Sequence, residues 1–482
     1  MGFSSIESAV SSNDALTAHR AAKARSVGIR RYFAIEDNAQ IVKFAQSTVG
    51  RIFLFLLFVP ALAHSNPYWF PIAVGAALCA YAGRYRSYAL TATTLIVLGL
   101  TVSWFGLYPL DKIQATAYAC FFAFSLTYLL FARRNQKLFV VRRSVVTLLC
   151  FFMILTGIAN SQLIYGAALD LLWAFLEVFV KYVWFLAYAL ADQRTRACSP
   201  LHFQFGTFHP FWSPVTAVPY GKGAAYLRKA MAKTHEELAI TQIKGLKLIF
   251  WSLVLSAIYK LLKWLIYDKL HLPLLTDVQA AYVAGHPYAV QVGWASLVWA
   301  TAEGAILIAI SGHRIVAIAR LAGFRLQRNT WRPLESRTLV DFWNRYNFYF
   351  KEVLVEFFFF PTFLTTFRGH PRLRVFFATF MAAGVGNAIF HFMVDIKYVK
   401  SMGLWNAVIS FESYIFYCII LATGIGISQA RARRDTPSIL GCLWSFACVW
   451  SFVVLLHVFG NETHVYTLGE RLSFMFSLFG VR

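Results

Sequence analysis

One strongly apolar stretch of the sequence carries four small or polar residues in helical register. They are, in chain order, Gly384, Asn387, His391 and Asp395. Spacings of three, four and four residues place them on one face of a helix. Ionisable side chains within a membrane span are costly and usually face a bundle interior or a wet cavity, where an imidazole can act as a general base. We therefore predict a functional site around His391; the alternative is a histidine hydrogen-bonded between Asn387 and Asp395 for helix packing.

A second polar group lies upstream, in the aromatic-rich segment 338–362. On a helix, Asn347 and Lys351 lie one turn apart, with Asn344 a turn earlier on nearly the same face. An amide at such a position can donate a hydrogen bond to a reacting group. The alternative is an interfacial helix with an aromatic belt, and the pattern alone favours this alternative.

Membrane-spanning helices are the elements that must position these side chains. Of the 482 residues, 59% are hydrophobic and only 14% are charged, whereas soluble domains carry about 25% charged residues. Recurring long apolar runs exclude an ordinary soluble enzyme and indicate an all-α, polytopic transmembrane helix bundle. We expect about eleven spans, near 51–64, 69–82, 88–108, 115–132, 144–160, 163–190, 245–267, 287–311, 374–395, 404–428 and 437–459.

Two long stretches, 197–235 and 313–372, are neither clean spans nor clean loops. Irregular backbone at membrane depth is tolerated only where it is buried in protein or lines a cavity. We therefore expect re-entrant or interfacial helices around a central channel, with the functional site among them. The predicted divisions are a basic cytoplasmic tail (1–49), N-terminal transmembrane helices (50–192), a core that contains the candidate site (193–400) and C-terminal transmembrane helices (401–482).

The basic residues predict the orientation. The formal net charge is +23, and Lys and Arg gather in alternate gaps between the apolar runs, as they do in cytoplasmic loops. These groups are Arg84 and Arg86; Arg133, Arg134, Lys137, Arg142 and Arg143; Arg194 and Arg196; Arg314 and Arg320; and Arg431, Arg433 and Arg434. We expect a multi-pass protein with a cytoplasmic N-terminus and the lipid bilayer, not nucleic acid, as its partner. The seven cysteines form no CxxC pair, so neither a disulfide framework nor a metal site is expected.

Motifs in the second irregular stretch and in the apolar span that follows it resemble those of the membrane-bound O-acyltransferase (MBOAT) family. The likeness is to its bacterial branch, which includes the alginate O-acetylation and teichoic acid D-alanylation membrane proteins. The motifs are Gly323-Phe324-Arg325-Leu326, Asn329, Arg332-Pro333, Asp341-Phe342-Trp343-Asn344-Arg345-Tyr346-Asn347 and Asn387-Ala388-Ile389-Phe390-His391. The sequence departs from the family pattern in two places. Asn347 replaces a common bacterial histidine, and Phe390 and Phe392 replace a tryptophan and a glycine around His391.

The resemblance implies an O-acyltransferase of the bacterial inner membrane, with His391 and Asn347 as catalytic residues. The donor would be a cytoplasmic thioester, either acyl-CoA or an acylated carrier protein, with no bound cofactor. The acceptor would be a hydroxyl, most plausibly on an exported polysaccharide, and an extracytoplasmic acyltransferase partner would complete the transfer. His391 suits the base and the Asn347 amide suits the oxyanion donor. Asn344, Lys351, Asn387 and Asp395 are the predicted supporting or channel-lining residues, with Asp395 placed to orient the imidazole.

Helix length adds an expectation about depth. His391 follows Arg374 by 17 residues, which is about 26 Å along a helix at ~1.5 Å per residue. With Arg374 at the cytoplasmic edge, we expect His391 past the membrane midplane toward the outer side, so a cytoplasmic donor would reach through a channel to meet an acceptor that enters from outside. The alternatives are a lipid acyltransferase that uses long-chain acyl-CoA and a non-enzymatic glycan exporter or transporter subunit.

Overall fold

The computed structural model describes residues 34–104, 112–194, 198–213, 217–430, 439–460 and 464–481. Within these ranges the chain is helical and has no β-strand, only one isolated bridge between Met231 and Phe324. The all-α prediction is confirmed. Several basic residues used to predict the orientation lie outside the described residues: Arg196, Arg431, Arg433, Arg434 and those of the tail up to residue 33.

Eight of the described helices are long and apolar enough to cross a membrane, so the chain is a membrane-embedded helical protein. They are α3 (Thr48–Ser65), α6 (Lys112–Arg134), α9 (Ala167–Gln193), α12 with its π-helical end η4 (His235–Lys263 and Trp264–Lys269), α14 (Val290–Leu321), the run α18–η7–α19 (Pro371–Val394), α22 (Glu412–Ala430) and α23 (Ile439–Gly460). Two apolar helices, α4 (Trp69–Tyr81) and α8 (Ser144–Asn160), are shorter. The total of about eleven spans stays a prediction.

The spanning run from Pro371 consists of α18 (Pro371–Phe380), η7 (Met381–Gly386) and α19 (Asn387–Val394). The other described elements are η2 (Ile35–Asp37), α2 (Ala39–Gln46), η3 (Gly83–Tyr85), α5 (Arg86–Trp104), α7 (Phe139–Arg142), α10 (Leu201–Gly206), α11 (Ala224–Ala230), α13 (Leu275–Val283), η5 (Pro333–Glu335), α15 (Leu339–Tyr346), α16 (Phe348–Leu354), η6 (Val355–Phe359), α17 (Phe360–Thr365), α20 (Ile396–Met402), α21 (Leu404–Ser410) and α24 (Leu468–Ser477). The segments η6 and η7 are π-helical, a form found as short insertions in α-helices and often at functional sites.

The predicted span 404–428 is two helices, so the prediction of one continuous span is wrong. α21 ends at Ser410 and α22 begins at Glu412. The Ser410 hydroxyl lies 3.1 Å from the Ala407 carbonyl oxygen, a local hydrogen bond of the kind that competes with helix continuation.

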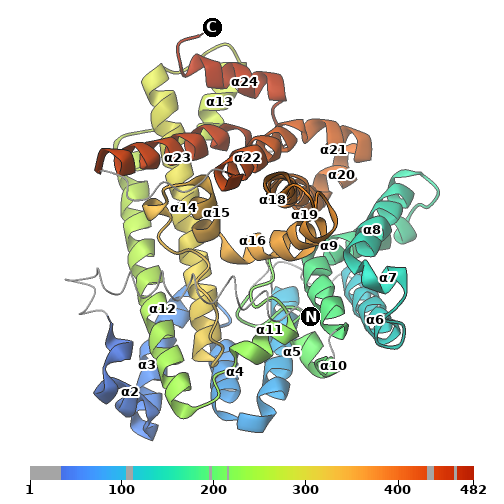
Figure 1. Ribbon diagram of the computed structural model, residues 1–482, viewed down its shortest axis with the longest axis vertical. Coiled ribbons are helices and arrows are strands. Elements are labelled where there is room, and N and C mark those ends of the chain that lie inside the picture. Colours follow the sequence, from blue (N-terminus) through green and yellow to red (C-terminus); the bar gives the residue numbers. More distant parts are fainter. Residues whose placement is uncertain are drawn as a thin grey trace.

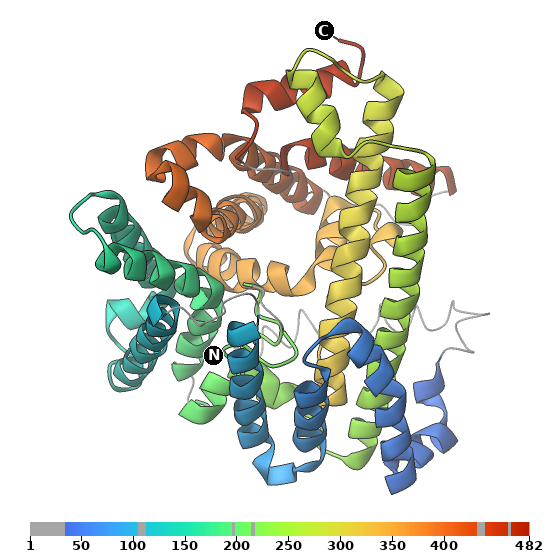
Figure 2. The ribbon, with the colours of Figure 1, turned by 180° about the vertical axis from the view of Figure 1, so that it is seen from behind.

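The helices do not share one direction. α12 and α14 pack side by side and run along the long axis of the molecule, whereas α18 and α19 are seen end-on in the same view (Figure 1). The view from behind also shows α18 and α19 along their axis, encircled by neighbouring helices (Figure 2). The run α18–η7–α19 is thus strongly inclined to α12 and α14, and the depth of His391 in the membrane stays a prediction.

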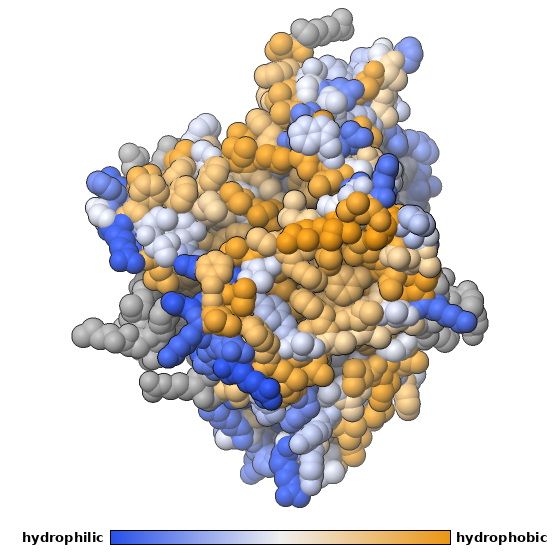
Figure 3. All heavy atoms as spheres, turned by 90° about the vertical axis from the view of Figure 1, so that its right-hand side faces the viewer, coloured by the Kyte–Doolittle hydropathy of each residue, from blue (hydrophilic) through white to orange (hydrophobic). Residues whose placement is uncertain are grey.

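The spans differ strongly in burial, which separates the core from the periphery. In α9, 78% of the most apolar window is buried inside the molecule, whereas in α12 the value is 11%. α9 is therefore a central helix, and α12 presents most of its apolar surface outward. Large apolar areas also cover the face seen in Figure 3, with hydrophilic residues gathered mainly toward its lower part. Such exposed apolar surface fits contact with lipid.

Candidate functional site

His391 lies in the middle of α19, shortly after the π-helical segment η7. Three aromatic rings surround its imidazole: the ring centroids of Tyr414, Phe350 and Phe390 lie 4.8, 5.5 and 5.5 Å from that of His391. The residue is nevertheless half-buried rather than sealed. Its ring makes no hydrogen bond to any residue that the structure describes. Both ring nitrogens are therefore available to a ligand.

The polar neighbours of His391 on α19 bond elsewhere. Asn387 is buried, and its Oδ1 accepts a hydrogen bond of 3.5 Å from the Tyr414 hydroxyl. Asp395 ends α19, and its carboxylate lies 3.5 Å from Nε2 of His464. The alternative in which Asn387 and Asp395 hold His391 for helix packing is therefore wrong, as is the expectation that Asp395 orients this imidazole.

The segment 338–362 turns at Asn347 instead of continuing as one helix. Asn347 has φ −142° and ψ 80°, so α15 ends and α16 begins at this residue. A helix start leaves backbone N–H groups without intrahelical partners, and Asn329 accepts two of them. Its carbonyl oxygen accepts from Phe348 N at 2.9 Å, and its Oδ1 accepts from Tyr349 N at 3.2 Å. The prediction of a continuous helix is wrong because Asn329 stabilises the break.

The break leaves the Asn347 side chain with an unused polar group. Its Oδ1 is buried and has no hydrogen-bond partner, which costs about 1–3 kcal/mol unless a ligand is bound. Phe350 lies one turn further along α16, and its ring is the one 5.5 Å from the imidazole. Asn347 and His391 therefore belong to one neighbourhood, with Phe350 between their helices.

Asn344 and Lys351 belong to a charged group beside this neighbourhood. Lys351 Nζ lies 3.4 Å from Asn344 Oδ1 and 2.9 Å from a Glu352 carboxylate oxygen, while Lys222 Nζ lies 2.5 Å from the other oxygen. Burial would raise the pKa of Glu352, but the two ammonium groups lower it below the usual value. Burial would likewise lower the pKa of Lys222, but Glu352 raises it. Glu352 and Lys222 therefore stay ionised near neutral pH, and their ion pair joins α16 to the first irregular stretch.

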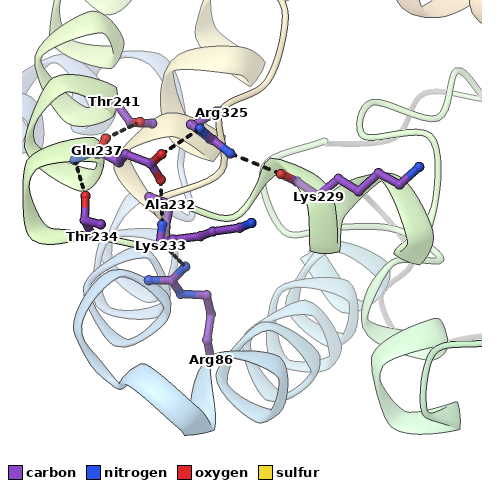
Figure 4. Close-up of polar contacts among 8 residues, drawn as sticks. All are labelled: Arg86, Lys229, Ala232, Lys233, Thr234, Glu237, Thr241 and Arg325. Carbon is purple, nitrogen blue, oxygen red and sulfur yellow. Dashed lines mark hydrogen bonds and ion pairs between the residues drawn. The ribbon is translucent and has the colours of Figure 1, made fainter. Parts of the chain in front are cut away.

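The two irregular stretches meet at the end of the molecule where α12 begins (Figure 4). Arg325, from the Gly-Phe-Arg-Leu turn, lies 3.1 Å from a Glu237 carboxylate oxygen and donates to the Lys229 carbonyl at 3.2 Å. Arg86 donates to the Ala232 carbonyl at 3.1 Å. The Gly-Phe-Arg-Leu turn thus joins α11 to α12, and Arg86 of α5 binds the connection between these two helices. The turn has a structural role apart from the residues near His391.

A largely apolar pocket of about 250 Å³ lies between α8, α19, α21 and α22. Its lining includes Phe152, Ala388, Ile389 and Phe392. The three lining residues of α19, Ala388, Ile389 and Phe392, lie on the opposite face of this helix from Asn387 and His391. The pocket is therefore separate from the site around the imidazole, and its wall suits a hydrocarbon chain.

Two residues near the site were missed by sequence reasoning. Tyr414 contacts both His391 and Asn387, but a tyrosine within an apolar run gives no signal. Lys222 stands between two glycines, and all three of these residues have positive φ, of 114°, 50° and 82° in chain order. The Gly-Lys-Gly triplet was a signal for a special turn in the first irregular stretch. Its pairing with Glu352 joins residues 130 positions apart, which no local pattern indicates.

Comparison with known proteins assigns no family to the chain. No protein-family model matches the chain, and no curated protein matches it. Among the residues that the structure describes, no group of three His, Cys, Asp or Glu side chains is placed to hold a metal ion.

Proposed function

We propose that this protein is a membrane O-acyltransferase that passes an acetyl or other short acyl group from a thioester to a hydroxyl. One observation carries the proposal: an imidazole without a hydrogen-bond partner in the described structure shares its neighbourhood with the unsatisfied buried amide of Asn347. A free base and a free amide in one partly enclosed place are the groups that acyl transfer needs. The motif resemblance to the MBOAT family is independent support.

The reaction follows from the roles of the two groups. The acceptor hydroxyl attacks the thioester carbonyl carbon while His391 takes the hydroxyl proton. Asn347 donates an amide N–H to the oxyanion, since a half-turn of its amide plane exchanges the oxygen and the nitrogen. Collapse of the tetrahedral intermediate breaks the C–S bond. The imidazolium then returns its proton to the departing thiolate.

The proposed setting is the bacterial inner membrane with a cytoplasmic N-terminus. The donor would be acyl-CoA or an acylated carrier protein, and the acceptor an exported polysaccharide, reached through a channel beside His391. An extracytoplasmic acyltransferase partner would complete the transfer. The cluster that contains Arg86, Lys229, Lys233 and Arg325 (Figure 4) would then lie at the cytoplasmic end.

A lipid acyltransferase that uses long-chain acyl-CoA is the second candidate. Its support is Asn347, because many eukaryotic members of the family that the motifs resemble have asparagine at this position. The two candidates share the same catalytic residues and differ in the acylated product.

The decisive experiment compares His391→Ala with wild type by mass spectrometry of surface glycans and membrane lipids. We expect acylation of one product class to fall by about 10²–10⁴-fold while protein level and glycan export persist. His457→Ala is the matched control, since His457 is another half-buried histidine within a span. Altered export with acylation untouched would instead identify a non-enzymatic exporter subunit.

A further inference from the structure

Three polar side chains converge where α21 gives way to α22. Ser410 is the last residue of α21, Asp395 follows α19, and His464 lies in the loop between α23 and α24. The Ser410 hydroxyl lies 2.7 Å from His464 Nδ1, and His464 Nε2 lies 3.5 Å from a carboxylate oxygen of Asp395. One imidazole therefore lies between a hydroxyl at hydrogen-bond distance and a carboxylate within ion-pair distance of Nε2, a nitrogen that makes no hydrogen bond to the described residues.

Burial and aromatic stacking fix the position of the His464 ring. The His464 side chain is fully buried, with 0% of its surface exposed. Its ring stacks on Tyr398, with centroids 4.2 Å apart, and on Phe411 at 5.4 Å. Burial lowers the pKa of His464 despite the opposing effect of Asp395, and the charge of Lys397 adds to the lowering. The ring is therefore neutral near pH 7 and can accept a proton.

The ordinary reading of Ser410 is a helix-end contact. Its Oγ also lies 3.1 Å from the Ala407 carbonyl oxygen and 3.5 Å from the Met402 sulfur. A serine hydroxyl has one proton and can donate it to the carbonyl or to the imidazole, but not to both fully. The helix-end contact explains neither the buried imidazole nor the carboxylate at its other nitrogen. If Ser410 is a nucleophile, His464 its base and Asp395 the group that orients the base, the positions of all three side chains are explained.

We propose that Ser410 is a second acyl-transfer nucleophile, with His464 as its general base and Asp395 as the residue that positions the base. Its substrate is an acyl ester or acyl thioester. The Ser410 Oγ–C bond forms, the bond from the acyl carbon to the donor oxygen or sulfur breaks, and the serine proton passes through His464 to that leaving group. An acceptor hydroxyl then attacks the Ser410 ester, its proton passes through His464 to Oγ, and the serine is restored.

The new centre lies next to the site around His391. The ring of His391 is 4.8 Å from that of Tyr414, Tyr414 is 5.1 Å from Phe411, and Phe411 is 5.4 Å from His464. Two aromatic rings thus separate the two imidazoles. The inference rests on the proposed acyltransferase function, in which Ser410 would hold the acyl group between the thioester donor and the final acceptor.

An activated serine is tested directly with an alkyl fluorophosphonate, which phosphonylates nucleophilic hydroxyls and releases fluoride. The full-length protein in detergent is treated with the probe, and the modified peptide is identified by mass spectrometry. We expect labelling of Ser410 in wild type and its loss in Ser410→Ala. We expect labelling about 10²-fold slower in His464→Gln and slower to a smaller degree in Asp395→Asn. Ser401→Ala, an exposed serine of α20, is the matched control and should label as wild type.

Two results would overturn the inference. The first is wild-type protein, monodisperse and with a cooperative thermal transition, whose Ser410 is labelled no faster than Ser401; this result depends on no variant that might fail to fold. The second is equal labelling in His464→Gln and wild type. The His391→Ala protein separates the two proposals: Ser410 labelling that persists while acylation is lost supports both. If acylation survives in His391→Ala, the proposed role of His391 is wrong, whereas the labelling of Ser410 is unaffected by that result.

Discussion

Asn344 and Asn347 are two amides only three residues apart, yet the fold places them differently. Asn344 is exposed and bonds to Lys351, whereas the Asn347 oxygen is buried without a partner. If Asn347 stabilises the oxyanion, Asn347→Ala should lower the rate of acyl transfer about 10²-fold, with little change in the KM for the donor because the oxyanion exists only in the transition state. The measurement is turnover of a labelled acyl donor by the purified protein.

The neighbouring asparagine is the control for this prediction. Asn344→Ala removes one exposed contact and should leave the rate near wild type. Equal losses in the two variants would mean that the segment acts through its folding rather than through an amide at the reacting group.

At the scale of elements, the close approach of η6 and η7 determines where His391 lies. Gly386 ends η7, and a Cβ added there would lie 2.7 Å from two ring carbons of Phe358 in η6. Gly386→Ala therefore forces these segments apart. We expect it to lower the free energy of unfolding by about 1–3 kcal/mol and to reduce acyl transfer, since α19 follows directly. Thermal unfolding in detergent and the transfer assay measure the two effects.

A glycine in α14 offers the matched substitution. A Cβ added at Gly304 would meet no atom within 4 Å, so Gly304→Ala should leave stability unchanged or raise it by up to about 1 kcal/mol through helix propensity. If Gly386→Ala is as stable and active as Gly304→Ala, the packing of the two π-helical segments does not position the site.

At the scale of the whole molecule, α12 links two opposite ends, and each end offers an exposed residue. Lys233 precedes the start of α12, and His286 lies in the loop between α13 and α14 at the other end (Figure 1). If the N-terminus is cytoplasmic and the end with the basic cluster faces the cytoplasm, a cysteine at 286 should react with a membrane-impermeant maleimide in intact spheroplasts. A cysteine at 233 should react only after permeabilisation.

This experiment requires a background without the native cysteines, because Cys120, Cys150 and Cys448 are exposed on the molecule. The reverse labelling pattern would show that the protein has the opposite orientation in the membrane. The acyl donor would then have to approach from the end that carries α13 and α24.

Local sequence properties determined the helical membrane class and the polar face of α19. Apolar runs, helical spacing and the rarity of charge act within one segment, so each can be recognised without knowing the fold. The same reasoning singled out Asn347 and His391, although their shared neighbourhood was an expectation from family resemblance rather than from spacing.

Only the tertiary structure decided which side chains bond and where helices break. Asn329 stabilises the break at Asn347 from 18 residues away, His464 takes the carboxylate that sequence reasoning assigned to His391, and Ser410 meets that same imidazole from another helix. The direction of α18 and α19, which differs from that of α12 and α14, likewise came only from the tertiary structure. These outcomes depend on contacts between distant segments, and a buried polar group bonds to whichever partner the packing brings within reach.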